Sequence, residues 1–178
     1  FVQDDPVHGV PMTERTEFRV LYDDKALYLG FWCFDSEPNK ILARTMSRDD
    51  WPDADDFLII SIDPFLDRRN GYMFAVNPNG SRFDAIINNN AYAGSSWDTI
   101  WDCRGEVTNK GWFCEFKLPF DSIAFARNKT TWGFNVERTI RRKNEEGKWH
   151  SEGRHLSTSA MANAGEIRGL KGLGKVSK

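Results

Sequence analysis

Three extended runs decide the fold class of this chain: TEFRVLY at Thr16–Tyr22, ALYLGFWCF at Ala26–Phe34 and FLIISID at Phe57–Asp63. Each run is rich in aromatic and β-branched residues, which favour strands that bury one or both of their faces. Short turns and an acidic loop around Trp51 separate the three runs. These runs therefore predict paired strands that pack into a β-sandwich.

The hydrophobic pattern of the first two runs predicts where each lies in its sheet. Thr16–Tyr22 alternates apolar and charged residues, which indicates one buried and one solvent-facing side. Ala26–Phe34 is apolar on both sides, as is typical of a central strand that is covered on both faces. We therefore expect the second run to lie deep in the molecule.

The rest of the chain continues in the same manner. Further extended runs alternate with hairpin turns and occupy residues 72–76, 81–87, 101–107, 111–118 and 132–140, while short helices are predicted near residues 40–45 and 119–125. The Asn70-Gly71 pair marks one of the turns, because both residues tolerate a positive φ. The pattern predicts an all-β chain that forms an antiparallel two-sheet, jelly-roll-like β-sandwich with one or two short helices.

Length and composition indicate the number of domains and exclude some classes of partner. With 178 residues, the chain is long enough for one core, so we expect a single domain over residues 1–178, as a fragment of a longer protein. The net charge of -2 gives no field that would attract nucleic acid, and no apolar run has the roughly 18 residues of a membrane-spanning helix. The three cysteines lack metal-type spacing and allow at most one disulfide; buried free thiols are the expected outcome.

Several phrases, taken in order, resemble a known family: the N-terminal family 9-type carbohydrate-binding domain (CBM9-like) of bacterial proteins that continue into an uncharacterised β-barrel region. The phrases that carry the resemblance are Val20–Asp24, Ala26–Phe31, Arg48-Asp49 with Asp55–Phe57, Ile62–Tyr72, Val76–Gly80 and Trp132–Arg138. The resemblance covers residues 14–173.

The resemblance implies two packed antiparallel sheets, structural calcium and a sugar clamped between two tryptophans. By position, Trp51 is similar to the first clamp residue and Trp149 to the second. Modules of this family carry a glutamate in the strand after the first tryptophan, whereas this chain has Leu58, Ile59 and Ile60 there. The hydrogen-bonding set is therefore incomplete or supplied from elsewhere in the chain.

A sugar presents an apolar CH face and a ring of hydroxyl groups, so its receptor needs aromatic rings and planar polar side chains. Trp51 and Trp149 are the candidate stacking residues, with packing over the rim of the sandwich as the alternative; Trp97 is left open. The strand tryptophans are predicted to lie in the core: Trp32, Trp101, Trp112 and Trp132. The candidate partners of hydroxyl groups are strand residues that could instead pair in solvent: Arg82, Asp84, Asn135, Glu137 and Arg138.

Calcium is the one cofactor that the sequence suggests. Asp63, Asp67 and Asn70 offer oxygen ligands in the turn after the third run, but they lack the spacing of an EF-hand. The resemblance to the family supports calcium binding at these residues, whereas their spacing alone does not.

The predicted function is non-catalytic carbohydrate binding by an accessory module of an exported protein involved in glycan binding or breakdown. The expected partners are a mono-, oligo- or polysaccharide and the following β-barrel region, at the periplasm or cell surface in association with an outer membrane. One alternative is a docking module for that barrel that binds no glycan. Glycoside hydrolysis is a minor alternative, since the chain has carboxylates but neither a GxSxG nor an HExxH motif.

Overall fold

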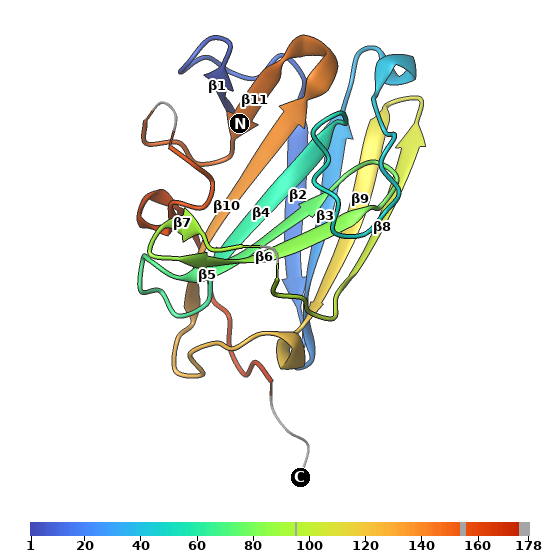
Figure 1. Cartoon of the computed structure of the whole chain (residues 1–178). Helices are drawn as coiled ribbons and strands as arrows, with labels where there is room; N and C mark the ends of the chain where they lie inside the picture. The colour runs from blue at the N-terminus through green and yellow to red at the C-terminus, as the bar shows by residue number, and fades with distance from the viewer. Residues whose placement is uncertain (95, 154–155, 175–178) are drawn as a thin grey trace.

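Two antiparallel sheets pack face to face in the computed structural model of the chain, which describes residues 1–94, 96–153 and 156–174 (Figure 1). The larger sheet has eight strands. Its order is β1 (Val2–Asp5), β11 (Glu145–Lys148), β10 (Thr131–Ile140), β4 (Phe57–Asp63), β5 (Gly71–Val76), β6 (Arg82–Asn88) and β7 (Ala91–Tyr92), and β12 (Gly165–Arg168) also pairs with β10. The predicted all-β sandwich is confirmed.

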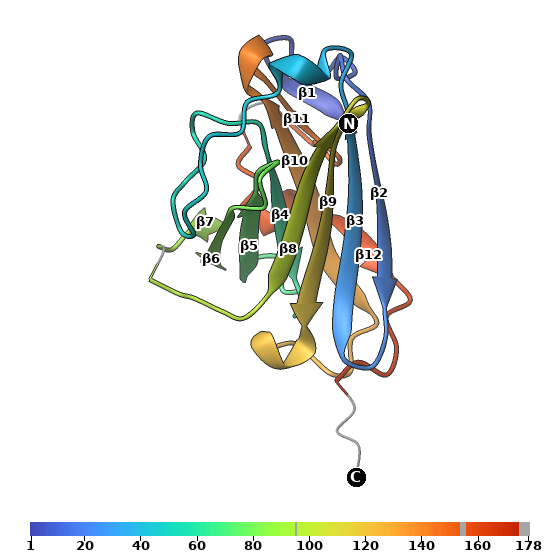
Figure 2. The same ribbon diagram turned by 90° about the vertical axis from the view of Figure 1, so that its right-hand side faces the viewer.

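The smaller sheet has four strands, in the order β2 (Thr16–Tyr22), β3 (Ala26–Phe34), β9 (Gly111–Pro119) and β8 (Asp102–Thr108). Figure 2 shows these strands side by side across one face of the molecule. The alternation predicted for β2 is found, since Phe18 and Val20 pack against the core while Arg19 is exposed.

Helical structure is confined, within the described residues, to four single 3-10 turns: η1 (Pro38–Lys40), η2 (Phe120–Ser122), η3 (Arg141–Lys143) and η4 (Met161–Asn163). The short helix predicted near residues 40–45 is reduced to η1. The backbone N–H groups of Arg44 and Thr45 donate instead to the Asp55 carboxylate, at 2.7 and 2.8 Å, and this holds the segment as a loop. No helix in the described part of the chain is long and apolar enough to cross a membrane.

The main core lies between the two sheets and contains most of the predicted core tryptophans. Trp101, Trp112 and Trp132 are almost completely buried there. Trp32 differs from the prediction, because it lies on the outer face of β3 and is only partly buried. The strand is central in its sheet, as expected, but its second apolar face remains partly open to solvent.

A second apolar cluster covers the outer face of the larger sheet, on the side away from the main core. Its side chains come from β4, β5 and β6 and from the segment around η4: Phe57, Ile59, Met73, Ala75, Phe83, Ala85, Ile87, Met161 and Ala164. This cluster explains why β4 and β5 are buried on both faces. It also forms an apolar floor on which a ligand could rest.

Candidate functional site

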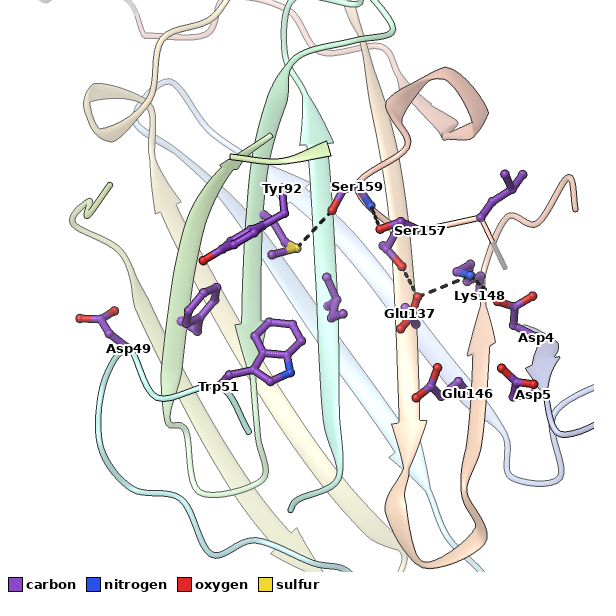
Figure 3. Close-up of a pocket in the computed structure, with 15 residues that line it drawn as sticks. Asp4, Asp5, Asp49, Trp51, Tyr92, Glu137, Glu146, Lys148, Ser157 and Ser159 are labelled. Atoms are coloured by element: carbon purple, nitrogen blue, oxygen red, sulfur yellow. Dashed lines mark hydrogen bonds and ion pairs between the residues drawn. The ribbon is translucent and has the colours of Figure 1, made fainter. Parts of the chain in front are cut away.

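A pocket of about 680 Å³ lies on the outer face of the larger sheet (Figure 3). Ile59 from β4, Met73 from β5 and Phe83 from β6 form part of its lining. All three side chains belong to the second apolar cluster, so the pocket has a preformed apolar floor. An apolar pocket with a few convergent polar groups is a typical small-molecule site.

Aromatic rings form one side of this pocket. The Trp51 ring packs edge-on against Phe57 and Phe83, with ring centroids 5.5 and 5.1 Å apart, and Trp51 remains 37% exposed. Tyr92, from β7, lies 6.3 Å from Phe83 and is 48% exposed. The two exposed rings are fixed by apolar contacts, and such rings suit stacking against the CH face of a sugar.

Buried polar groups hold the loop that carries Trp51. The Asp55 carboxylate accepts hydrogen bonds from the backbone of Arg44 and Thr45 and from Asn77 Nδ2, the last at 2.8 Å. Burial alone would raise the pKa of Asp55, but these hydrogen bonds lower it below its ordinary value. Asp49 N donates to the Arg82 carbonyl at 2.8 Å and ties the loop to β6. The loop is therefore anchored on both sides of Trp51.

Charged side chains form the opposite side of the pocket. Glu137 on β10 pairs in register with Lys148 on β11, and the Lys148 Nζ lies 3.7 Å from a Glu137 oxygen and 2.8 Å from an Asp4 oxygen. Thr158 donates a hydrogen bond to Glu137. Burial raises the pKa of Glu137, while the Thr158 hydrogen bond and the Lys148 charge oppose that shift. Figure 3 shows these groups facing the aromatic side across the pocket.

Comparison with solved structures finds the same two-sheet architecture in proteins described as carbohydrate-binding. A candidate carbohydrate-binding protein from Bacteroides uniformis matches with a TM-score of 0.69 at 13% identity, over 89% of this chain and 79% of that chain. A family 9 carbohydrate-binding module (CBM9) from Caldicellulosiruptor kristjanssonii, solved with glucose, matches with a TM-score of 0.63 at 16% identity, over 95% and 81% of the two chains. A CBM9 structure from the same organism with cellotriose gives 0.60 at 17% identity, over 95% and 80%.

The chain has the fold of a family 9 carbohydrate-binding module. No protein-family model matches the sequence, and no curated protein matches it.

Within this CBM9 fold, the structure brings Trp51 and Glu137 together in one pocket. The glutamate that the family resemblance implies on the strand after Trp51 is replaced by apolar residues, including Ile59. Glu137 lies directly opposite Ile59 in the β10–β4 pairing. A carboxylate from the neighbouring strand therefore enters the same region of the pocket.

Trp149 does not form a clamp with Trp51. Its ring packs against Phe18 and Phe134 at the edge of the main core, with centroids 5.5 and 5.9 Å apart. It also lies on Gly165, where an added Cβ would come within 2.6 Å of the ring. Trp149 is absent from the lining of the Trp51 pocket. The expected pairing of the two tryptophans is thus corrected: Trp149 occupies the packing position at the rim of the sandwich.

We expect Trp149→Ala to destabilise the fold by about 2 kcal/mol, because it removes a half-buried ring from two aromatic contacts. Sugar affinity is expected to change less than about twofold, since the ring lies outside the pocket. Urea unfolding and a glucose titration measure the two quantities, and Trp149→Phe serves as the conservative control. A large loss of affinity in a folded Trp149→Ala protein would contradict this assignment.

Arg82 and Asp84 lie on the inner face of β6, which alternates with the face that carries Phe83 into the pocket. Asp84 is buried and accepts hydrogen bonds from Trp101 Nε1 at 2.7 Å and from Arg48 at 3.2 Å. Arg82 donates to the Trp101 carbonyl. These two predicted hydroxyl partners therefore organise the region around Trp101 and do not line the Trp51 pocket.

Asn135 and Arg138 are likewise held by the protein itself. Asn135 exchanges hydrogen bonds with the backbone of His150, at 3.0 and 3.1 Å. Arg138 is 0% exposed and extends between the two sheets, where it donates to the backbone of Arg15 and Phe34. A side chain in that position cannot reach a ligand in the pocket, so the role predicted for Arg138 is corrected to a structural one.

The side chains predicted as calcium ligands are hydrogen-bonded within the protein. Asp63 accepts hydrogen bonds from three backbone N–H groups, at 2.8 to 3.4 Å. Asp67 accepts from Asn70 Nδ2, while the Asn70 oxygen accepts from Asn89 N. N–H donors directed at these oxygens occupy the positions that a cation would need. The described residues contain no cluster of three or more His, Cys, Asp or Glu side chains that could hold a metal. Calcium binding stays a prediction.

Several pocket residues were not predicted from the sequence. Tyr92 lies in the irregular segment between the predicted runs 81–87 and 101–107, and its aromatic character was the available signal. Lys148 and Glu146 face the pocket because they alternate along β11, a strand that has little hydrophobic pattern of its own. Thr158 reaches Glu137 from a loop, and no local pattern indicates that contact.

Proposed function

We propose that the chain binds a carbohydrate without catalysing its cleavage, and that the Trp51 pocket is the binding site. The observation that carries this proposal is the meeting of an exposed, fixed indole with charged hydrogen-bonding groups in one pocket. The fold similarity to a CBM9 solved with glucose supports the proposal.

In the proposed complex, Trp51 and Tyr92 cover the apolar CH face of a sugar ring. Hydroxyl groups on the ring edge then meet Glu137, Glu146 and Lys148 on the opposite side. Carboxylates accept hydrogen bonds from hydroxyl groups, and the lysine ammonium donates hydrogen bonds to them. The carboxylates and the lysine together can therefore bind a hydroxyl group both as a donor and as an acceptor. Aromatic contact supplies affinity, and the polar side fixes the orientation.

The direct test is a calorimetric titration of the folded chain with glucose and with cellotriose. Saturable binding that depends on Trp51 is the expected result. No heat and no change in tryptophan fluorescence with any of a panel of neutral glycans, at millimolar ligand, would overturn the proposal. That outcome would favour the docking alternative, in which a following β-barrel region covers the exposed ring.

The charge of the pocket predicts which sugars it rejects. Among the described lining residues there are five carboxylates and one lysine: Asp4, Asp5, Asp49, Glu137, Glu146 and Lys148. Arg48 offsets part of this charge, since its Nε lies 3.6 Å from Asp49, and Asp4 and Asp5 have partners of their own, so the remaining charge comes mainly from Glu137 and Glu146. The field nevertheless repels an anionic ligand.

We therefore expect glucuronate to bind about tenfold more weakly than glucose at low salt, because like charges in an interface are penalised. The difference is expected to shrink as salt screens the repulsion. Parallel titrations of the two sugars at two ionic strengths measure this effect. Tighter binding of glucuronate would contradict the predicted selectivity while leaving carbohydrate binding itself intact.

We further propose that this binding serves an exported protein that handles glycans at the periplasm or cell surface. In that setting the module would hold a saccharide near the rest of the protein, including the β-barrel region implied by the family resemblance. Fractionation of cells that produce the full protein, followed by immunodetection, tests the location. The non-catalytic assignment is tested separately, by the absence of new reducing ends when cellotriose is incubated with the chain.

A further inference from the structure

Two cysteine thiols lie in contact between neighbouring strands of the smaller sheet. In the β8–β9 pairing, Cys103 is opposite Phe116 and Gly105 is opposite Cys114, so the two cysteines are diagonal neighbours on one face. Their Sγ atoms are 3.0 Å apart, and both thiols are free in this structure. A disulfide bond is about 2.05 Å long, so closure requires a movement of about 1 Å.

The third cysteine is placed differently. Cys33 lies on β3, the other neighbour of β9, where it is opposite Trp112 and completely buried. Cys103 is partly exposed on the edge strand β8, on the core-facing side that it shares with Cys114. An oxidant in solution can therefore reach Cys103, which in turn contacts Cys114.

The position of β8 allows the small movement that bond formation needs. β8 is the edge strand of its sheet, paired with β9 on one side. Most of its residues are exposed, although the backbone of Pro78 and Gly80 packs closely on Gly105. A buried central strand would resist the same displacement far more strongly.

We propose that Cys103 and Cys114 are a modification site at which an intramolecular disulfide forms by exchange with a low-molecular-weight disulfide such as oxidised glutathione. In the first step, the Cys103 thiolate attacks one glutathione sulfur, the reagent S–S bond breaks and one glutathione thiolate leaves. In the second step, the Cys114 thiolate attacks the Cys103 sulfur of the mixed disulfide, and the second glutathione leaves. Two protein thiols are oxidised, one reagent disulfide is reduced, and the two thiol protons pass to the two leaving thiolates.

The second step is expected to be the slower one. Contact with Cys103 and burial raise the pKa of the Cys114 thiol well above its ordinary value. A smaller fraction of Cys114 is then present as the thiolate that must attack. The mixed disulfide on Cys103 is therefore expected to accumulate first, and proximity then drives its conversion to the internal bond.

The experiment begins with the fully reduced chain, which is incubated with oxidised glutathione, quenched with acid and examined by intact mass spectrometry. We expect the mass of the monomer to fall by that of two hydrogen atoms. Titratable thiols after denaturation are expected to fall from three to one, and peptide mapping is expected to join Cys103 to Cys114 and leave Cys33 reduced. The oxidised chain is expected to melt about 5 °C higher than the reduced chain, because the bond restricts the unfolded chain.

Matched variants separate this site from general oxidation. Cys33→Ser is expected to oxidise as the wild type does, whereas Cys114→Ser is expected to stop at a glutathione adduct on Cys103. Three free thiols after prolonged incubation of the wild type would overturn the proposal. A stable glutathione adduct on the wild type, or an internal bond that includes Cys33, would overturn it as well. The peptide map of the wild type decides the outcome even if a serine variant does not fold.

Discussion

Trp51→Ala is expected to weaken glucose binding by about 100-fold, which makes binding undetectable in most titrations. The indole supplies the largest apolar surface that a sugar ring could cover in the pocket, and losing that contact costs about 2–3 kcal/mol. The ring is partly exposed but packs against Phe57 and Phe83, so its removal is also expected to lower the free energy of unfolding by about 1–2 kcal/mol and to leave the chain folded. Calorimetry on the variant and the parent chain measures the effect.

Trp32→Ala is the matched control for this experiment. Trp32 is also a partly buried tryptophan, but it lies on the outer face of the smaller sheet, away from the pocket. Its removal is expected to leave glucose affinity unchanged. Trp51→Phe is expected to retain part of the affinity, because a smaller ring still covers the sugar. Equal affinity in Trp51→Ala and the parent would place any sugar site elsewhere on the molecule.

The strands with a clear hydrophobic pattern could be predicted almost to the residue, and the polar ones could not. Thr16–Tyr22 and Ala26–Phe34 have the predicted boundaries. β1, with the sequence VQDD, and β11, with the sequence EEGK, pair with each other at the edge of the larger sheet and were missed. Their pairing brings together residues at opposite ends of the chain, and no local propensity encodes such a contact.

In the candidate site, too, residues with a local sequence pattern could be predicted, and residues placed by long-range pairing could not. Trp51 and Glu137 were named individually as candidates, whereas for Trp149 the structure shows the alternative, packing at the rim of the sandwich. Lys148 on β11 faces the pocket, and the period of two in a strand turns the next residue, Trp149, toward the core. Because β11 itself was not predicted, this alternation could not be applied to Trp149.

Arg138 offers a case in which the available pattern was sufficient. The period of two in the run 132–140 puts it on the same strand face as Trp132, Phe134 and Val136, and the structure places all four between the sheets. Charge suggested a ligand contact, whereas strand geometry indicated the core. The geometry proved the better guide, since the guanidinium satisfies backbone carbonyl groups of the opposite sheet and therefore has a reason to be buried.

Arg138→Ala is expected to lower the free energy of unfolding by about 3–5 kcal/mol at neutral pH. The arginine donates to the carbonyl groups of Arg15 and Phe34, at 3.0 and 2.9 Å, and to Thr16 Oγ1 at 2.9 Å. Its removal leaves buried acceptors without donors and opens a cavity between β10 and the smaller sheet. Urea unfolding followed by tryptophan fluorescence measures the loss.

The pH dependence of this loss tests its electrostatic part. Burial raises the pKa of Asp56 to about 6, although the Arg141 N–H and the Arg138 charge oppose the shift. Because the folded-state pKa lies above the unfolded value, stability from protonated Asp56 is present at low pH and is lost as pH rises through about 6. Without the Arg138 charge, ionised Asp56 destabilises the folded state more strongly, so Arg138→Ala is expected to lower the free energy of unfolding more at pH 8 than at pH 5.

Arg168→Ala is the control for this comparison, because it removes an exposed arginine. It is expected to change the free energy of unfolding by less than about 0.5 kcal/mol at either pH. A loss in Arg138→Ala that matches this surface control would show that the buried guanidinium does not hold the sheets together.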